Sequence, residues 1–294
     1  MNRAFHQVNV FSPLPVGGNP VAVVHDADGL TDEQMAAFAR WTNLSETTFL
    51  LAPTPEGRAG GADYRVRIWT PGGELPFAGH PTLGTAHAWL ESGGVPGGSE
   101  VVQECGVGLV RLRRDAVGDG QRLAFAAPPL ARSGPVDDAD LARIARALRI
   151  EPADVVRSAW VDNGPGWVAV QLRDAAAVLA LEPDHVAMGD LKVGVVGAYP
   201  VGDGDHGGPQ AADAPAVEVR AFAPSLGDGE DPVTGSLNAG LGQWLAGDVL
   251  PASYVAAQGT VLRRAGRVHV EKLPDGAVWV GGDTVTTIAG QVGL

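Results

Sequence analysis

The chain has 294 residues and only one cysteine, Cys105. A single cysteine excludes an intrachain disulfide, and the absence of disulfides is typical of the reducing cytosol, so we expect a cytoplasmic protein. It also excludes any reaction that needs two thiols within one chain.

Basic residues are scarce as well. The chain has 21 Lys and Arg against 34 Asp and Glu, which gives a formal net charge of −13 and a pI near 4.8. A nucleic-acid-binding surface needs positive charge, so we expect no nucleic-acid partner. No apolar run approaches the roughly 20 residues of a transmembrane helix, and the first residues, MNRAFHQVNVFSP, lack the apolar core of a signal peptide. We therefore expect no membrane partner.

What the chain does contain favours a well-packed globular protein. Apolar residues make up 45% of it, which is enough for a sizeable buried core. The 41 glycines and 22 prolines stand between periodic segments, where they predict turns rather than disorder. The glycine-rich stretch 202–208 is expected to be a surface loop.

One motif occurs twice. Residues 74–84 and 230–240 share the pattern E-x-P-x-x-G-x-x-x-x-G, and the segments just before them, 67–71 and 220–224, both begin with Arg and end with Pro. A solenoid needs at least about three repeats, so two copies predict a duplicated domain instead. We expect two similar lobes related by a pseudo-twofold axis, with a cleft between them. Positions with the same residue in both copies should maintain the fold. The differing positions should serve the chemistry, and these are Leu75/Asp231, Ala78/Thr234 and His80/Ser236.

Local patterns predict an α+β protein. Strands are expected at 4–11, 21–24, 47–51, 64–70, 101–113, 121–126, 168–172, 217–222, 267–271 and 277–280. Thr31 and Gln34 form a capping box that predicts a helix to about Trp41. Further helices are expected from Pro81 to about Glu91, over 138–148, and from Ser236, as the cap, to about Gly247.

The lobe boundary is expected in a proline-rich linker. Residues 128–135 are rich in proline and carry few strand signals, which places the N-terminal lobe at 1–127 and the C-terminal lobe at 128–284. The last strand, beginning near Thr284, is expected to return to the N-terminal lobe, so that residues 285–294 complete it.

Both copies of the motif lead into a helix. Gly79 and His80 precede the first of these helices, and Gly235 and Ser236 precede the second. Helix N-termini present free amides and the positive end of a dipole, and glycine allows close backbone approach. Two such starts facing one cleft would bind a small carboxylate, although each alone could be an ordinary helix start with a turn glycine.

Three residues could move or balance protons. Glu46 follows the first helix and opens an apolar strand, where it is either a plain loop charge or a partly buried carboxyl. Burial would raise its pKa toward neutrality and make it a usable proton carrier. His80 and Asp231 would add titratable groups of different pKa, as proton transfer requires.

No competing motif predicts another chemistry. The chain has no P-loop, no strand-borne G-x-G-x-x-G with a distal acid, no H-E-x-x-H and no G-x-S-x-G. His80 and His87 are too far apart on one helix to chelate a metal as i, i+4 partners do, so no metal site is expected.

Four segments carry a resemblance to a known family. They are GNPVAVV at 18–24, RWTNLSETTF at 40–49, FAGHPTLGT at 77–85 and GEDPVTGS at 229–236. Together they resemble the PhzF-like isomerases of phenazine biosynthesis, which have the diaminopimelate-epimerase fold. The likeness extends through Gln258-Gly259 and Val280-Gly281-Gly282 and covers nearly the whole chain. It is highly specific for the family and much less specific for the substrate.

The resemblance implies a fold, a reaction and a set of site residues. The fold is a duplicated one in which each lobe is a largely antiparallel sheet curled around a central helix, and the protein is a homodimer without a cofactor. The type reaction isomerises 2,3-dihydro-3-hydroxyanthranilate by moving a proton. Carried over by motif, Glu46 is the proton shuttle. His80, Asp231 and Ser236 hold the substrate's polar groups, and the backbone amides of Gly79 and Gly235 lie near its carboxylate. Ser45 is a further substrate-binding residue.

The resemblance also limits the reaction. The epimerase branch of the fold carries a cysteine at each of the positions that match Ala78 and Thr234, so two-thiol racemisation is excluded here. Two functions stay open: a cofactor-free isomerase acting on a small cyclic or amino-substituted carboxylic acid, and a catalytically silent protein that binds such acids. The presence of Glu46, His80 and Asp231 favours the enzyme, because a binding protein needs no titratable Glu opposite its anion site.

Overall fold

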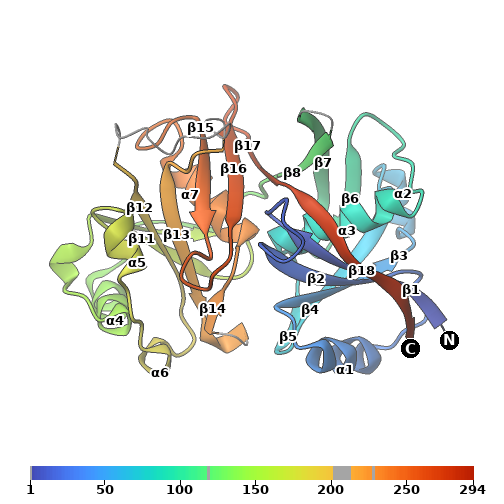
Figure 1. Cartoon of the computed structure of the whole chain (residues 1–294), viewed down its shortest axis with the longest axis horizontal. Helices are drawn as coiled ribbons and strands as arrows, with labels where there is room; N and C mark the ends of the chain where they lie inside the picture. The colour runs from blue at the N-terminus through green and yellow to red at the C-terminus, as the bar shows by residue number, and fades with distance from the viewer. Residues whose placement is uncertain (1, 118–119, 201–212, 227–228) are drawn as a thin grey trace.

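The computed structural model describes residues 2–117, 120–200, 213–226 and 229–294. The glycine-rich stretch 202–208 lies outside the described residues. Two lobes stand side by side, each with a sheet around one long helix, and the last strand crosses back to the first lobe (Figure 1). This is the α+β architecture expected from the duplicated motif.

The N-terminal lobe contains eight strands and three helices that come from the first part of the chain. Among the residues of this lobe that the structure describes, the strands are β1 Asn2–Val10, β2 Asn19–Val24, β3 Glu46–Leu51, β4 Tyr64–Thr70, β5 Gly73–Leu75, β6 Val101–Cys105, β7 Gly108–Val117 and β8 Gly120–Ala126. The helices are α1 Asp32–Thr42, α2 Pro55–Ala59 and α3 Gly79–Glu91. The capping box at Thr31 and Gln34 is present with both of its hydrogen bonds.

The C-terminal lobe repeats this arrangement. Its strands are β9 Arg132–Gly134, β10 Arg157–Asp162, β11 Trp167–Gln171, β12 Lys192–Ala198, β13 Val217–Ala223, β14 Gly229–Asp231, β15 Ser253–Gln258, β16 Gly266–Lys272 and β17 Val278–Gly282. Its helices are α4 Asp138–Leu148, α5 Ala175–Leu179, α6 His185–Met188 and α7 Gly235–Leu245, with short 3₁₀ turns at Pro152–Asp154 and Pro224–Leu226. The final strand is β18, Thr284–Gly293.

The order of strand pairing is the same in both lobes. In the first, β2 and β3 are parallel, β3 and β4 antiparallel, and β4 pairs with the short β5 and runs parallel to β6. In the second, β11 and β12 are parallel, β12 and β13 antiparallel, and β13 pairs with the short β14 and runs parallel to β15. Thus α3 and α7 are equivalent, as are β2 and β11.

The two equivalent helices form the centre of the molecule. Most residues of α3 and α7 are buried, because each helix is enclosed by the sheet of its own lobe. Small residues make this possible: a Cβ on Gly84 would lie 2.3 Å from a Val21 methyl group, and one on Gly240 would lie 2.4 Å from the Val161 carbonyl oxygen. One continuous apolar core includes residues from both lobes.

Four strands and helices differ from the sequence predictions. The segment 101–113, expected as one strand, forms the antiparallel pair β6 and β7. Helix α3 begins at Gly79, so Pro81 occupies its third position, where a missing N–H is equally harmless. Ser236 does not cap α7, which begins at Gly235 with Thr234 as its N-cap. The predicted linker 128–135 contains the short strand β9, which pairs with β10.

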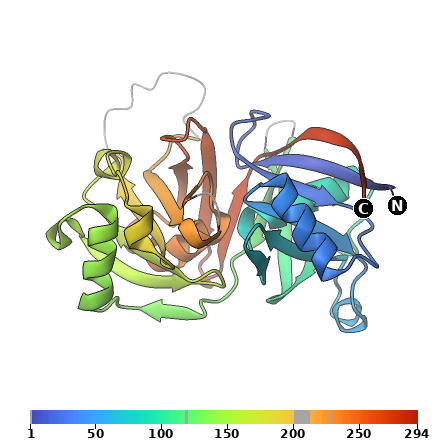
Figure 2. The same ribbon diagram turned by 90° about the horizontal axis from the view of Figure 1, so that it is seen from below.

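The lobes are joined at several places. Strand β8 pairs antiparallel with β17, and β18 runs antiparallel to β1, which returns the end of the chain to its beginning (Figure 2). The lobe boundaries at 127 and 284 stay a prediction. Among the helices of the described residues, none combines the length and the apolar character needed to cross a bilayer.

Candidate active site

The starts of α3 and α7 meet between the lobes. A Cβ added to Gly79 would lie 2.6 Å from the Gly235 Cα, and one added to Gly235 would lie 2.8 Å from the Gly79 Cα. Only glycine permits this approach. The first amides of both helices, which have no partner within their own helix, therefore lie close to one another. This is the face-to-face arrangement predicted from the duplicated motif.

A cavity lies beside this junction and is lined by both lobes. Its empty volume is about 530 Å³, including its open mouth, which is in the range of small-molecule sites. The N-terminal lobe contributes Leu44, Ser45, Glu46, Pro71, Leu75 and Ala78. The C-terminal lobe contributes Pro165, Trp167, Ala223, Gly229, Asp231, Thr234 and Ser236. Seven of these thirteen residues have apolar side chains, and five have polar or charged ones.

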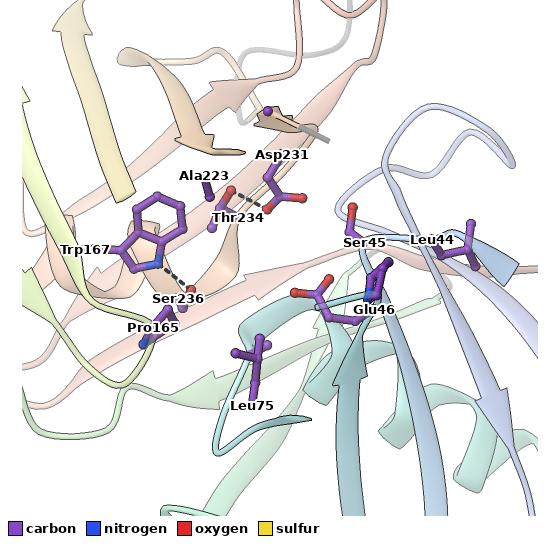
Figure 3. Close-up of a pocket in the computed structure, with 13 residues that line it drawn as sticks. Leu44, Ser45, Glu46, Leu75, Pro165, Trp167, Ala223, Asp231, Thr234 and Ser236 are labelled. Carbon is purple, nitrogen blue, oxygen red and sulfur yellow. Dashed lines mark hydrogen bonds between the residues drawn. The ribbon is translucent and has the colours of Figure 1, made fainter. Parts of the chain in front are cut away.

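Glu46 is the first residue of β3 and faces this cavity. Its side chain points into the space between the lobes, while Asp231 points back toward Ser45 (Figure 3). Glu46 is 8% exposed, so the second of the two sequence interpretations, a buried carboxyl, is the one observed. The parallel pairing of β3 with β2 places Glu46 opposite Val21 and fixes its backbone.

His80 lies directly behind Glu46. Its Nε2 is 3.4 Å from Glu46 Oε2, and the ring is 2% exposed. Burial lowers the pKa of His80 from 6.5 to about 3, although the Pro20 backbone carbonyl acts in the opposite direction. His80 is therefore neutral at physiological pH, and it can accept or donate a hydrogen bond without placing a positive charge beside Glu46.

Asp231 is held by both lobes. Asn19 donates from Nδ2 to Asp231 Oδ1 at 2.8 Å, and Thr234 donates from Oγ1 to Oδ2 at 2.5 Å. The same Asn19 nitrogen donates to the Val233 carbonyl at 2.9 Å and lies 3.3 Å from His80 Nδ1. Asn19 is fully buried and thus connects His80 of one lobe with Asp231 of the other.

A second amide side chain supports the loop that carries Asp231. Gln258 donates from Nε2 to Thr234 Oγ1 at 2.9 Å and to the Asp231 carbonyl at 3.2 Å. Its Oε1 accepts from the Thr234 amide at 3.0 Å and from Asn238 at 2.9 Å. Because both ends of Gln258 are used, the turn between β14 and α7 has little freedom to move.

Ser236 has a different partner from its counterpart His80. Its hydroxyl accepts a hydrogen bond from Trp167 Nε1 at 3.0 Å, and both residues line the cavity. Trp167 opens β11 as Asn19 opens β2, so each lobe places an N–H donor from equivalent strands against the second residue of its central helix. The two halves of the site are related by the duplication but differ in chemistry.

Of the predicted site residues, Ser45, Glu46, Asp231 and Ser236 line the cavity, and Gly79, His80 and Gly235 lie directly behind it. Asn19, Trp167, Thr234 and Gln258 were not among the predicted site residues. Asn19 and Gln258 stood inside segments that carry the family resemblance, and Thr234 was noted only as a position where the copies differ. Trp167 had no signal in the sequence.

Among the described residues, no group of three or more His, Cys, Asp and Glu side chains is arranged to hold a metal ion.

Known proteins share this chain's sequence and fold. Residues 8–290 match the family of phenazine biosynthesis-like proteins. The chain is 35% identical to antisense-enhancing sequence 1 of Schizosaccharomyces pombe, with 98% of both chains covered. It is 36% identical to the trans-2,3-dihydro-3-hydroxyanthranilate isomerase of Pseudomonas aeruginosa, over 78% of this chain and 74% of that one.

A solved structure agrees with these matches. A predicted epimerase of Pseudomonas aeruginosa superposes with a TM-score of 0.74 at 27% identity, covering 99% of each chain. The expected epimerase-like fold is therefore confirmed. The matched residues span nearly the whole chain and include both lobes and both copies of the motif. The chain belongs to the phenazine biosynthesis-like family, the family of the PhzF proteins.

Proposed function

We propose that this PhzF-family protein is a cofactor-independent isomerase that moves a proton on a small cyclic or amino-substituted carboxylic acid. The observation that carries the proposal is the position of Glu46, a buried carboxyl group that faces a cavity formed by both lobes. The type reaction of the family, isomerisation of trans-2,3-dihydro-3-hydroxyanthranilate, belongs to a relative of 36% identity, so we use it as the first test and not as the assigned reaction.

The substrate carboxylate is assigned to the helix starts. The residues that line the described cavity include no Lys or Arg, so no cationic side chain is available to an anionic group there. The amides at the N-termini of α3 and α7 can take this role, because they are orphan donors at the positive ends of two helix dipoles.

Asp231 and Ser45 are assigned to the polar substituents of the ring. Each oxygen of Asp231 accepts a hydrogen bond, one from Asn19 and the other from Thr234. A carboxylate oxygen can accept more than one hydrogen bond, so Asp231 can also accept from a substrate N–H or O–H. Asn19 acts here as a positioning residue, because it reaches the substrate only through Asp231 and His80. Apolar neighbours such as Leu75 and Trp167 would exclude water from the ring.

The proton moves through Glu46. The ionised carboxyl takes a proton from one ring carbon, and the electron pair left behind is delocalised into the conjugated system of the substrate. The carboxylic acid then returns the same proton to another carbon on the same face. No atom is gained or lost, so the step needs no co-reactant. A neutral His80, whose Nε2 lies 3.4 Å from Glu46 Oε2, places no positive charge beside Glu46 and so does not favour its ionised form.

The test replaces Glu46 with Gln. The amide keeps the shape and hydrogen-bonding capacity of the side chain but cannot accept the carbon proton, and general base catalysis contributes about 10²–10⁴-fold. We expect Glu46→Gln to lower kcat by that factor and to leave ligand affinity nearly unchanged. Asp231→Asn and His80→Ala should weaken both binding and rate. Turnover is followed by absorbance with trans-2,3-dihydro-3-hydroxyanthranilate first and related amino-substituted ring acids next.

The matched control is Glu33→Gln, an exposed residue of α1 that should leave the rate unchanged. If Glu46→Gln retains nearly the wild-type rate on a true substrate, Glu46 is structural and the mechanism is wrong. Wild-type protein that binds these acids tightly and turns over none of them would instead identify a catalytically silent binding protein.

The single free cysteine leads us to place the protein in the cytoplasm.

A further inference from the structure

The C-terminal lobe lines the cavity with two hydroxyl groups, those of Thr234 and Ser236. Thr234 donates its hydroxyl proton to Asp231 and accepts a hydrogen bond from Gln258 Nε2. A hydroxyl has only one proton, so Thr234 has none left for a ligand. Ser236 differs, because its hydroxyl oxygen is used as an acceptor.

Trp167 determines how the Ser236 hydroxyl is used. The indole Nε1–H donates to Ser236 Oγ at 3.0 Å (Figure 3), and across the described part of the chain this is the one hydrogen bond of that hydroxyl. An indole has a donor and no acceptor, so Ser236 cannot return its own proton to Trp167. The hydroxyl proton is thus left for a group in the cavity, which Ser236 lines.

Burial holds the indole in this orientation. Trp167 is 2% exposed and Ser236 is 4% exposed, so water has little access to either polar atom. A buried N–H that loses its partner is destabilising, and buried indole groups therefore keep a hydrogen bond. Because Ser236 supplies that bond, the orientation of the ring and the direction of the hydroxyl proton are coupled.

The turn between β10 and β11 brings Trp167 to this position. Asp162 Oδ1 accepts hydrogen bonds from the amides of two glycines in the turn, at 2.8 and 2.6 Å. From the same turn, Asn163 Nδ2 donates to the Ser236 carbonyl at 2.8 Å. The hydroxyl and the backbone of Ser236 are therefore both held by a single turn.

We propose that Trp167 is a positioning residue of the isomerase site, which commits the Ser236 hydroxyl to donate and so makes this part of the cavity select a carboxylate. This role rests on the proposed function, which places the substrate carboxylate at the starts of α3 and α7. The first amides of both helices are donors too, so Ser236 adds a directed side-chain donor to a group of backbone donors. A carboxylate, which only accepts, fits such a set better than a group that also donates.

A packing role for Trp167 would have different consequences. A ring that only fills space contributes equally to every ligand of the same shape, whereas a ring that directs a proton favours ligands that accept it. Trp167→Phe separates the two roles, because it keeps an aromatic ring and removes the Nε1–H. The Ser236 hydroxyl is then free to rotate, and its oxygen can accept from a ligand as well as donate to it.

The test measures binding of anthranilate and 2-aminobenzamide to the full chain by calorimetry. The two probes share the ring and the amino group, but the carboxylate only accepts hydrogen bonds and the carboxamide also donates. Wild type should prefer anthranilate by about tenfold or more, because hydrogen bonds to charged groups are stronger. In Trp167→Phe this preference should fall about 2–10-fold, the range for one net hydrogen bond. Trp41→Phe, the same change at an indole that is 79% exposed, should keep the wild-type preference.

Ser236→Ala completes the comparison. Its preference for anthranilate should be reduced, and adding Trp167→Phe should not reduce it further, because the indole acts through the hydroxyl. If Trp167→Phe weakens both probes equally, or has the same effect with and without Ser236, Trp167 has a packing role and the proposal is wrong. A wild type that binds anthranilate no more tightly than 2-aminobenzamide would also overturn it.

A measurement on wild type covers the case in which a variant does not fold. The Nε1–H resonance of Trp167, assigned by triple-resonance spectra, should shift downfield when anthranilate is added, because a hydroxyl that donates to an anion becomes a better acceptor. An unchanged resonance at saturating anthranilate would show that the hydroxyl does not donate to the ligand. Neither binding nor this resonance depends on turnover, so failure of the positioning role and failure of the isomerase are separate outcomes.

Discussion

At the scale of single residues, the positions that differ between the two copies act in pairs. Leu75 and Ala78 of the first copy are replaced by Asp231 and Thr234 of the second, and the Thr234 hydroxyl donates to the Asp231 carboxylate. The threonine hydroxyl thus donates to Asp231 and accepts a hydrogen bond from Gln258. These are two of the three differing positions at which chemistry was expected, and their side chains in the second copy interact directly.

The buried His80 makes stability depend on pH. Its pKa is lowered from 6.5 to about 3 in the folded protein, so the unfolded chain binds a proton there in the interval between these values and the folded one does not. The free energy of unfolding should therefore fall as the pH is lowered from 6.5, by at most about 1.4 kcal/mol per pH unit for this group. His80→Gln should reduce this slope in urea unfolding curves measured above about pH 4.

The control for this prediction is His185→Gln, because His185 is exposed and should leave the slope as in wild type. Burial also lowers the pKa of His25 to about 4, and that of His87 and His269. Because these histidines also contribute to the pH dependence, the slope of the unfolding free energy against pH is compared between each variant and wild type. Equal slopes for wild type and His80→Gln would show that His80 is not buried in a neutral form.

At the scale of elements, the shared positions of the two copies hold equivalent hairpins. Arg67 of β4 donates to both oxygens of Glu74 at 2.7 and 2.6 Å, and Arg220 of β13 donates to both oxygens of Glu230 at 2.8 and 2.7 Å. The second pair is almost completely buried, and Arg220 also donates to the Leu181 carbonyl. These bidentate pairs fix the short strands β5 and β14, which end at Leu75 and Asp231.

The contact between α3 and α7 gives a stability prediction for Gly79. An added methyl group would lie 2.6 Å from backbone atoms of Gly235, which have no rotamer to change, so the two helix starts must separate. Overpacking of this kind typically costs about 1–3 kcal/mol, and we expect Gly79→Ala to lower the free energy of unfolding by such an amount in urea titrations.

Gly98→Ala is the matched control, because a Cβ at Gly98 meets no atom within 4 Å. That variant should be neutral or slightly stabilising, since alanine reduces the freedom of the unfolded chain. A Gly79→Ala protein as stable as wild type would mean that the helix starts are not in contact in solution.

At the scale of the whole molecule, the lobes form one unit around the site. Strands β8 and β17 pair across the boundary, Asn19 of the first lobe donates to Asp231 and Val233 of the second, and the apolar core is continuous. Any relative movement of the lobes would change the distance between Glu46 and Asp231. The geometry of the site is therefore a property of both lobes together.

Anion binding tests this arrangement directly. Sulfate or a small carboxylate should bind at the junction of α3 and α7 despite the net charge of −13, because distant charges are screened beyond about 8–10 Å at physiological salt and the nearest groups are amides. We expect slower hydrogen exchange in segments 78–82 and 234–238 when sulfate is added. Sodium chloride at equal ionic strength is the control. If sulfate slows exchange in neither segment, the proposed anion site is wrong.

The sequence alone determined those features that depend on neighbouring residues. Thr31 and Gln34 identified the start of α1, the patterns at 267–271 and 277–280 identified strands β16 and β17, and the repeated motif identified the duplication. The four family segments identified the family. In each case the physical cause, a cap, a turn or a periodic pattern, acts over a few consecutive residues.

Tertiary structure alone decided which side chains form the site. Asn19 meets Asp231 across 212 positions, and Trp167 meets Ser236 across 69, so neither contact leaves a local pattern in the chain. Ser236 was predicted to cap α7, yet its hydroxyl is used by Trp167, a partner brought in by another strand. The burial of Glu46 and the lowered pKa of His80 likewise depend on atoms from both lobes, because desolvation is set by everything that surrounds a group and not by its neighbours in sequence.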